Sequence, residues 1–498
     1  MKKTITILIT ILSFGYAQAQ APAIQWQKSL GGTLEDSGYA AQATPDGGCV
    51  LAGISKSNNG NVTGNHGGYD CWVVKLDATG TLQWQKSLGG SGSDQANAIQ
   101  NTADGGYILA GSSTSNNGDV TGNHGGKDYW IIKLNATGTL QWQKCLGGSD
   151  SDAAYAVQTT SDGGYVVTGY TSSNNGDVTE NNGDNDYWVV KLDATGTLQW
   201  QNSLGGLLDD QAFAIKTTSD GGYVVAGLTY SFDGDVTGNH GDYDFWIVKL
   251  DATGTLQWQK SLGGADTEEA YDIETTSDGG YIVAGNCSSN SGNVTGNHGN
   301  FDYWVVKLDA TGTIQWQKSL GGSLQDKAYG IETTPDGGFI LAGNTASNNG
   351  DVIGNHGLQD YWLVKLDATG TIQWQKCYGG SDNDFARTIQ TTTDGGYVAA
   401  GYSFSNSGDV TGNHGSSDFW SVKLASNSLT TTTFDKNAIL IYPNPVSDVL
   451  QIQTHNTTIT KTKIIAVSGK VIIEQTKNSN TINVENLAKG IYIIEVSS

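Results

Sequence analysis

The chain has 498 residues and a formal net charge of −23, with 49 Asp and Glu against 26 Lys and Arg. Arg387 is its single arginine, and a protein that binds nucleic acid needs clustered Lys and Arg, so this composition excludes that class and disfavours anionic membranes. Glycine is abundant at 69 residues, and the 37% hydrophobic content, with 14 Trp and 22 Tyr, is enough for a large folded core.

The N-terminus has the pattern of an export signal. Lys2 and Lys3 precede a mostly apolar stretch over residues 4–15, and Ala17-Gln18-Ala19 follows with small residues at alternate positions. This pattern predicts a signal peptide over residues 1–19, cleaved after Ala19. The alternative is a membrane anchor, but the apolar run is shorter than the ~20 residues that a span needs. No later stretch is long and apolar enough, so we expect no membrane span in the mature chain.

Five cysteines remain after the signal: Cys49, Cys71, Cys145, Cys287 and Cys377. An odd number in an exported chain is a poor basis for a disulfide framework. Cys49 and Cys71 are close enough in sequence to pair. We expect instead that all five are small, buried or half-buried residues.

The tryptophans recur at intervals of 58 residues, without insertion or deletion. One series is Trp26, Trp84, Trp142, Trp200, Trp258, Trp316 and Trp374, and the other is Trp72, Trp130, Trp188, Trp246, Trp304, Trp362 and Trp420. The two series account for all 14 Trp. One structural unit is therefore used seven times.

Each unit contains four short β-prone runs and no helical periodicity. In one copy the runs are 95–102, 107–111, 129–134 and 140–146, with tight turns at 103–106 and 135–138 and a long polar loop at 112–128. Four antiparallel strands repeated seven times predict a seven-bladed β-propeller. A β-solenoid is the alternative, although its coils usually repeat at about 20 to 30 residues.

The two ends of the array are out of phase. Residues 24–30 correspond to the fourth strand of a unit, and the last recognisable element, residues 419–424, corresponds to the third. In a ring, 24–30 would complete the blade that begins at Asp384 and leave no blade with an open edge. We therefore predict a propeller over residues 20–424, closed by its N-terminal strand.

Two resemblances support this interpretation. The segment KLDATGTLQW at 75–84 resembles the tryptophan-docking motif of PQQ-type quinoprotein propellers, which implies a blade style and not the quinone. Full repeats over 24–424 resemble uncharacterised repeats of secreted bacterial proteins, and this resemblance implies no activity.

Candidate binding residues lie in the long loops. In a propeller these loops share a face with the joins between blades, and here that face varies most among copies, which is typical of a recognition surface or of unconstrained loops. One recurring residue is His, at His66, His124, His240, His298, His356 and His414, with Asn182 in copy three. Another is acidic, at Asp119, Asp177, Asp235, Asp351 and Asp409.

The recurring His and acidic residues indicate a structural role and not metal binding. Equivalent positions of a seven-fold ring are about 10 Å or more apart, too far to share a zinc ion, so we interpret the His column as hydrogen-bonding residues that order the loops. The acidic residues are interpreted as turn caps, and calcium is a weaker hypothesis. A catalytic constellation must occur once, and the residues unique to one copy, such as Glu180 and Arg387, form none that is recognisable. We predict no catalytic residues, no metal site and no other cofactor.

The composition changes at Ala425. Residues 425–437 read as a linker, and from 438 to 498 glycine is sparse and the pattern is that of a small all-β domain. The segments IYPNPVSDVLQI at 441–452, SGKV at 468–471 and LAKGIYIIEV at 487–496 resemble the type A sorting domain of the type IX secretion system. An unrelated immunoglobulin-like module is the alternative. The resemblance implies a β-sandwich that directs export through the outer membrane.

Together these features predict an exported, non-enzymatic propeller at the cell surface or outside the cell. We expect it to engage the type IX secretion machinery and to bind a glycan or another surface protein. One alternative is a polysaccharide hydrolase or lyase with its site in the central channel, which a unique acid/base pair at the channel mouth would favour. The other is a structural spacer, which uniform copies would suit.

Overall fold

The computed structural model describes residues 20–426, 439–454, 459, 461–466, 470–476 and 480–497. The described residues belong to two compact units, Ala21–Ser426 and a C-terminal unit. The predicted signal peptide, 1–19, and residues 427–437 of the predicted linker lie outside the described residues. Ala425, which the sequence analysis placed in the linker, belongs to the first unit, where its N–H donates to the Ala23 carbonyl at 2.9 Å.

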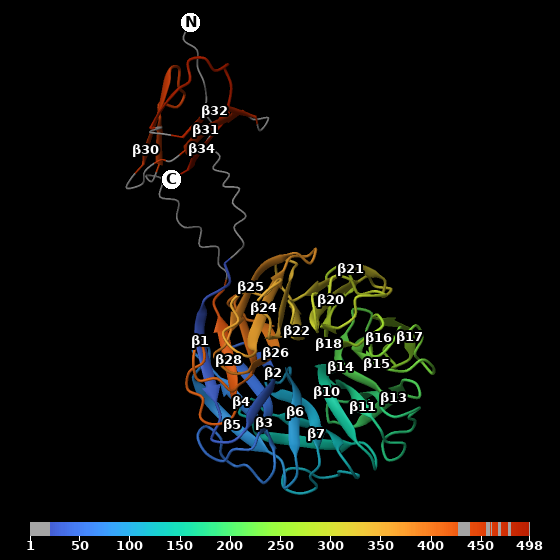
Figure 1. Cartoon of the computed structure of the whole chain (residues 1–498). Helices are drawn as coiled ribbons and strands as arrows, with labels where there is room; N and C mark the ends of the chain where they lie inside the picture. Colours follow the sequence, from blue (N-terminus) through green and yellow to red (C-terminus); the bar gives the residue numbers. More distant parts are fainter. Residues whose placement is uncertain are drawn as a thin grey trace. The chain divides into compact units, whose positions relative to one another are not determined.

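Each 58-residue repeat forms a four-stranded antiparallel sheet, and the seven sheets surround a central channel (Figure 1). The innermost strands are β2 (Asp36–Ala43), β6 (Asp94–Asn101), β10 (Asp152–Thr159), β14 (Asp210–Thr217), β18 (Glu268–Thr275), β22 (Asp326–Thr333) and β26 (Asp384–Thr391). The second strands are β3 (Cys49–Ser55), β7 (Tyr107–Ser113), β11 (Tyr165–Thr171), β15 (Tyr223–Thr229), β19 (Tyr281–Cys287), β23 (Phe339–Thr345) and β27 (Tyr397–Ser403).

The third strands are β4 (Asp70–Leu76), β8 (Asp128–Leu134), β12 (Asp186–Leu192), β16 (Asp244–Leu250), β20 (Asp302–Leu308), β24 (Asp360–Leu366) and β28 (Asp418–Leu424). The outer strands are β5 (Leu82–Leu88), β9 (Leu140–Leu146), β13 (Leu198–Leu204), β17 (Leu256–Leu262), β21 (Ile314–Leu320), β25 (Ile372–Tyr378) and β1 (Ile24–Leu30). The predicted propeller is confirmed, and the solenoid alternative is wrong because each group of four strands forms its own sheet. Blades are numbered here by their innermost strand, from β2 (blade 1) to β26 (blade 7).

The N-terminal strand belongs to the last blade. β1 pairs antiparallel with β28, with Ile24 opposite Leu424 and Leu30 opposite Phe419, in the sheet order β1-β28-β27-β26. Gln27 also accepts a hydrogen bond from the Trp420 indole at 2.8 Å. The side chains of Leu30 and Phe419 join one apolar cluster with Trp72 of blade 1. The strand predicted from the out-of-phase ends therefore completes blade 7.

Aromatic contacts on the third strands hold neighbouring blades together. The Trp of each third strand is fully buried, and in six junctions an aromatic ring of the preceding blade packs on it, with centroids 4.4 to 4.7 Å apart. Tyr129 adds a hydrogen bond from its hydroxyl to the Trp188 carbonyl at 2.8 Å. Such pairs contribute about 0.5–1.5 kcal/mol each beyond the area that they bury.

The outer-strand Trp docks on a turn of the next blade. Trp26 donates through its indole N–H to the Ala78 carbonyl at 3.1 Å. Trp84 lies so close to Gly138 that a Cβ there would be 2.8 Å from the indole, and Gly138 also has a φ of +76°. Both constraints require glycine in this turn. The contact agrees with the resemblance to a tryptophan-docking motif.

The C-terminal unit is a small β-sandwich. One sheet has the order β29 (Ile439–Tyr442), β30 (Val449–Thr454) and β33 (Thr481–Asn483), and the other has the order β32 (Val471–Gln475), β31 (Lys461–Ala466) and β34 (Tyr492–Ser497). Leu450 and Ile482 of the first sheet share a buried cluster with Ile464 and Ile494 of the second. The two sheets therefore enclose one core.

The five cysteines are free and buried, and Cys49 and Cys71 are not paired. Burial raises the pKa of Cys145 to about 12, so this thiol is not poised to react. In the part of the chain that the structure describes, there is no helix long and apolar enough to cross a membrane.

A mature chain that begins at Thr33, and so lacks β1, should melt at a lower temperature as one unit. It loses the burial of Leu30 and part of Trp26, which contributes about 2 to 4 kcal/mol, and it exposes the edge of β28 to solvent. Calorimetry of this chain beside one that begins at Gln20 measures the effect. Equal melting temperatures would show that β1 does not stabilise the ring.

Candidate functional site

The predicted His residues each anchor a long loop to a buried carboxylate. His66 contacts Asp70 through Nδ1 at 2.7 Å, and its backbone N–H donates to the same Asp70 oxygen at 3.0 Å. The pair recurs in blades 2, 4, 5, 6 and 7 at His124, His240, His298, His356 and His414. The Asp is fully buried while the imidazole is about two-fifths exposed. Each contact is thus local to one blade.

The predicted acidic residues accept hydrogen bonds from the joins between blades. Asp119 accepts the Gly89 N–H at 3.2 Å, and Asp177, Asp235, Asp351 and Asp409 accept the equivalent glycine N–H at 3.2 to 3.4 Å. His124 Nε2 lies 3.9 Å from Asp177 of the next blade. The two sets of residues approach each other at this junction, and their members are distributed around the ring. The structure does not gather them into one site.

Metal coordination has no ready-made ligand set here. Among the described residues, no group of three or more His, Cys, Asp or Glu side chains is arranged to hold a metal ion. Calcium in the loops stays a hypothesis from the sequence.

The two faces of the propeller differ in chemistry. On the face of the tight turns, the strand-three lysine of each blade pairs with the Asp of the Asp-Gly-Gly turn, as Lys75 does with Asp46 at 2.9 Å. On the face of the loops and joins, large apolar side chains are exposed. They are Leu34, Leu207, Tyr230, Phe232, Leu324, Ile353, Leu358 and Phe404. The exposed large apolar side chains of the propeller are therefore concentrated on the loop face.

A β-bulge in every innermost strand aims one side chain per blade at the channel. In β2 the pairing with β3 shifts between Gly38 and Ala40, so Tyr39 is the extra residue. The opposing glycine of β3, Gly53, is required, since a Cβ there would lie 2.1 Å from the Ser37 carbonyl oxygen. The seven bulge residues are Tyr39, Asn97, Tyr155, Phe213, Tyr271, Tyr329 and Arg387.

These seven residues, with Gln95 and Gln211, line a cavity of about 430 Å³ that we call the channel mouth. The innermost strands begin at the joins, so the mouth lies toward the loop face. Phe213 stacks on Tyr271 with centroids 5.0 Å apart, and Tyr155 and Tyr329 meet this pair edge-on at 5.1 and 4.8 Å. The result is an arc of half-buried aromatic rings interrupted by amides and one guanidinium.

Deeper in the channel, some copies carry charged side chains at a position where the others have an uncharged one. Lys216 contacts Glu274 at 2.6 Å, and Glu332 accepts the Thr391 hydroxyl at 2.8 Å. At the same position the other four blades carry Gln. Burial raises the pKa of Glu332 to about 7 and that of Asp272 to about 6, the latter with help from Glu274 and against Lys216.

The channel residues, apart from Arg387, are functional candidates that sequence reasoning missed. The departures from the repeat at the positions of Tyr39 and Gln42 were an available signal, because they are visible when the seven copies are aligned. The bulge that turns the first of these positions into the channel was not visible in the sequence.

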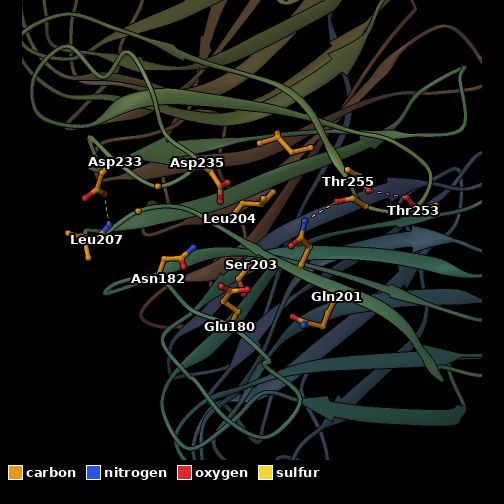
Figure 2. Close-up of a pocket in the computed structure, with 15 residues that line it drawn as sticks. Glu180, Asn182, Gln201, Ser203, Leu204, Leu207, Asp233, Asp235, Thr253 and Thr255 are labelled. Atoms are coloured by element: carbon orange, nitrogen blue, oxygen red, sulfur yellow. Dashed lines mark hydrogen bonds between the residues drawn. The ribbon is translucent and has the colours of Figure 1, made fainter.

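A second pocket, of about 880 Å³, opens between blades 3 and 4 and is drawn in Figure 2. Its lining includes three departures from the repeat: Glu180 where six copies have Gly, Asn182 where they have His, and Asn202 where they have Lys. Asn202 donates to the Gly254 carbonyl at 2.9 Å. In blade 3, amides thus replace a histidine and a lysine of the repeat, and a carboxylate replaces a glycine.

The loss of His in blade 3 leaves Asp186 without its usual partner. Asp186 still accepts the Asn182 N–H at 2.6 Å. Burial, together with the nearby Asp210, Asp235 and Glu180 carboxylates, raises its pKa from 3.8 to about 7. The native state therefore holds a proton that the unfolded chain releases near pH 4, and stability falls as the pH rises from about 4 to 7.

Asp186→Asn should therefore increase the free energy of unfolding at pH 8, by about 1 to 3 kcal/mol, and the gain should vanish near pH 4. The matched control is Asp128→Asn, which removes a carboxylate that His124 still contacts and should gain less. Denaturant unfolding at the two pH values measures both variants. An equal gain in both would contradict the role of the missing His.

Comparison with known proteins identifies the C-terminal unit. Residues 440–498 match the family model of the secretion system C-terminal sorting domain. This segment is a type IX sorting domain. The protein is accordingly one that the type IX secretion machinery exports to the cell surface or the extracellular space, as the sequence predicted.

The chain is also similar to more distant proteins. Over 293 residues it is 25% identical to the regulatory protein FlaEY of Caulobacter vibrioides, covering 52% of this chain and 30% of that protein. This chain thus spans less than a third of that relative. Similar solved structures include the Pan2 WD40 domain of Neurospora crassa, with 12% identity, a TM-score of 0.43 and coverage of 80% and 98% of the two chains. BamB of Moraxella catarrhalis has 13% identity, a TM-score of 0.35 and coverage of 92% and 91%.

Truncation after Ser426 should abolish secretion and leave the propeller intact. The compact unit that ends at Ser426 contains both ends of the ring, so we expect its melting temperature to stay within about 2 °C of the full chain, because few contacts should cross between domains. In the native host the truncated protein should accumulate in the periplasm. Residues 426–498 fused to a foreign exported protein should send it outside, and normal secretion of the truncated chain would refute the assignment.

Proposed function

We propose that this exported propeller is a binding protein whose ligand is a glycan held at the channel mouth. The observation that carries the proposal is the set of seven bulge residues. Five of them are aromatic, one is Asn97 and one is Arg387, whereas the third-strand Trp recurs in all seven blades.

The mouth has the composition of a small-ligand site. Its volume of about 430 Å³ falls in the roughly 300–1,000 Å³ range of such sites, which combine aromatic walls with a few polar groups. Sugar rings present C–H faces that pack on aromatic rings, and hydroxyls that pair with amides. Gln95, Asn97 and Gln211 supply amides beside the arc. Asn97 is held in place because it donates to the Ala154 carbonyl at 2.7 Å.

The surrounding face suits a ligand longer than one sugar. The exposed apolar side chains of the loop face lie on the loops and joins at the end of the propeller where the mouth opens. An extended glycan or the protein that carries it could contact them beyond the mouth. A protein partner without any glycan is the competing outcome of the binding test.

Hydrolysis of the bound glycan is a second candidate, which one observation favours. Asp272 and Glu332 are carboxylates below the arc at positions where most copies are uncharged, and burial raises their pKa values to about 6 and about 7. A carboxylic acid with a pKa near the working pH is suited to general acid catalysis. The half-buried Lys216–Glu274 ion pair lies among them.

The test is titration of the mature protein with a panel of neutral and acidic oligosaccharides. Phe213→Ala and Tyr155→Ala should each weaken binding about tenfold or more, as truncation of a buried aromatic anchor does. Phe232→Ala removes a 60% exposed ring on the loop face outside the mouth; it should bind short oligosaccharides as the parent does and lose affinity only for longer ones.

Other results of this experiment would place the binding site elsewhere or show that the protein hydrolyses the glycan. Exchange of residues 207–209 for Ser-Gly-Ser alters the pocket of Figure 2, so loss of binding in that variant alone would move the site there. Release of product from the panel that Glu332→Gln abolishes, with binding retained, would establish the hydrolase. A parent protein that binds no oligosaccharide refutes the proposal.

A further inference from the structure

Arg387 is the one cation of the propeller that is withdrawn from solvent into the channel without a carboxylate partner. The seven buried strand-three lysines all form ion pairs, each with the Asp of a tight turn. Lys216 in the channel pairs with Glu274, and Lys327 beside the mouth pairs with Glu269 at 3.5 Å. Among the described residues, Arg387 makes no ion pair.

The neighbours of Arg387 are aromatic. Its guanidinium carbon lies 4.1 Å from the Tyr329 ring centroid and 5.5 Å from that of Tyr402. Nη2 donates to the Tyr402 hydroxyl at 3.0 Å. Stacking on rings leaves the edge of the planar guanidinium open, and this edge is the part that recognises an oxyanion.

One donor on that edge is left over. Nε of Arg387 is buried and has no hydrogen-bond partner in the part of the chain that the structure describes. A buried donor without a partner costs about 1 to 3 kcal/mol, and the residue lines the mouth. The neighbouring bulge residues Tyr39 and Tyr329 bring no negative charge that would satisfy it.

We infer that the channel mouth selects an acidic sugar, whose carboxylate or sulfate accepts hydrogen bonds from Nε and a terminal nitrogen of Arg387. This inference rests on the proposed glycan-binding function and adds the class of ligand. The arc from Tyr155 to Tyr329 packs on the sugar ring, and the guanidinium at the end of the arc holds the anion. Elsewhere the protein repels anions, since its net charge is −23, so the selectivity is confined to this point.

The experiment compares three probes on the mature protein: tri-galacturonic acid, its methyl ester and a sulfated galactose oligosaccharide. The ester has the same rings without the charge. We expect the acid to bind at least tenfold more tightly than the ester, with an affinity that falls as salt rises. The sulfated probe shows whether the site takes carboxylate alone or both oxyanions.

Two substitutions locate the selectivity. Arg387→Gln should lower the acid-to-ester affinity ratio to about one, and Arg387→Lys, which keeps the charge but not the planar fork, should recover part of the loss. Lys327→Gln is the control for the change in charge, because that lysine already has a partner. If Arg387→Gln does not fold, the acid-to-ester ratio of the parent and of Arg387→Lys still decides.

Each other outcome overturns the inference. Equal binding of acid, sulfate and ester by the parent protein refutes the anion preference and leaves the glycan-binding proposal standing. A preference that persists in Arg387→Gln places the anion elsewhere. No binding of any of the three probes refutes the inference together with the proposed function for this ligand class.

Discussion

The contact of a third-strand Trp with an aromatic ring of the preceding blade, present at six of the seven junctions, is the interaction on which the propeller depends. A ring of seven blades closes only if the angle between successive sheets is the same at every junction, and buried aromatic pairs set that angle through shape and not through charge. The pair of Phe419 with Trp72, with centroids 4.7 Å apart, joins the last blade to the first. The junction from blade 1 to blade 2 differs, because Cys71 occupies the place of the ring.

This constraint explains where the seven copies are uniform and where they differ. Residues between sheets and in the tight turns recur because any change would alter the spacing of two blades. Bulge residues, joins and long loops contact solvent or the channel, and they are free to vary. The His–Asp and Asp–backbone contacts of the loops recur in most blades. The residues that recur most visibly in the sequence therefore hold the loops in place.

The channel brings together side chains from all seven blades, because the blades converge at the centre of the ring. A residue on an outer strand lies far from its six equivalents, whereas a bulge residue faces the other six across one cavity. Small departures from the repeat therefore combine there, as an aromatic arc with one arginine at the mouth and a group of carboxylates with one lysine below it. The loops supply exposed apolar surface around that centre, and the opposite face has its lysines paired.

The amino-acid sequence by itself determined the seven blades, the four strands of each and the out-of-phase ends, because strand periodicity, turn residues and an unbroken 58-residue spacing are local properties of the chain. It also determined the export route, since the sorting motifs are contiguous segments. Only the tertiary structure decided which positions face one another. Tyr39 and Arg387 are 348 residues apart in sequence, and they reach the same cavity because a bulge reverses the expected alternation and the ring brings blades 1 and 7 together. The recurring His and Asp residues drew attention to the loops and not to the channel, because recurrence in sequence reflects what every blade needs, while the channel residues differ from blade to blade.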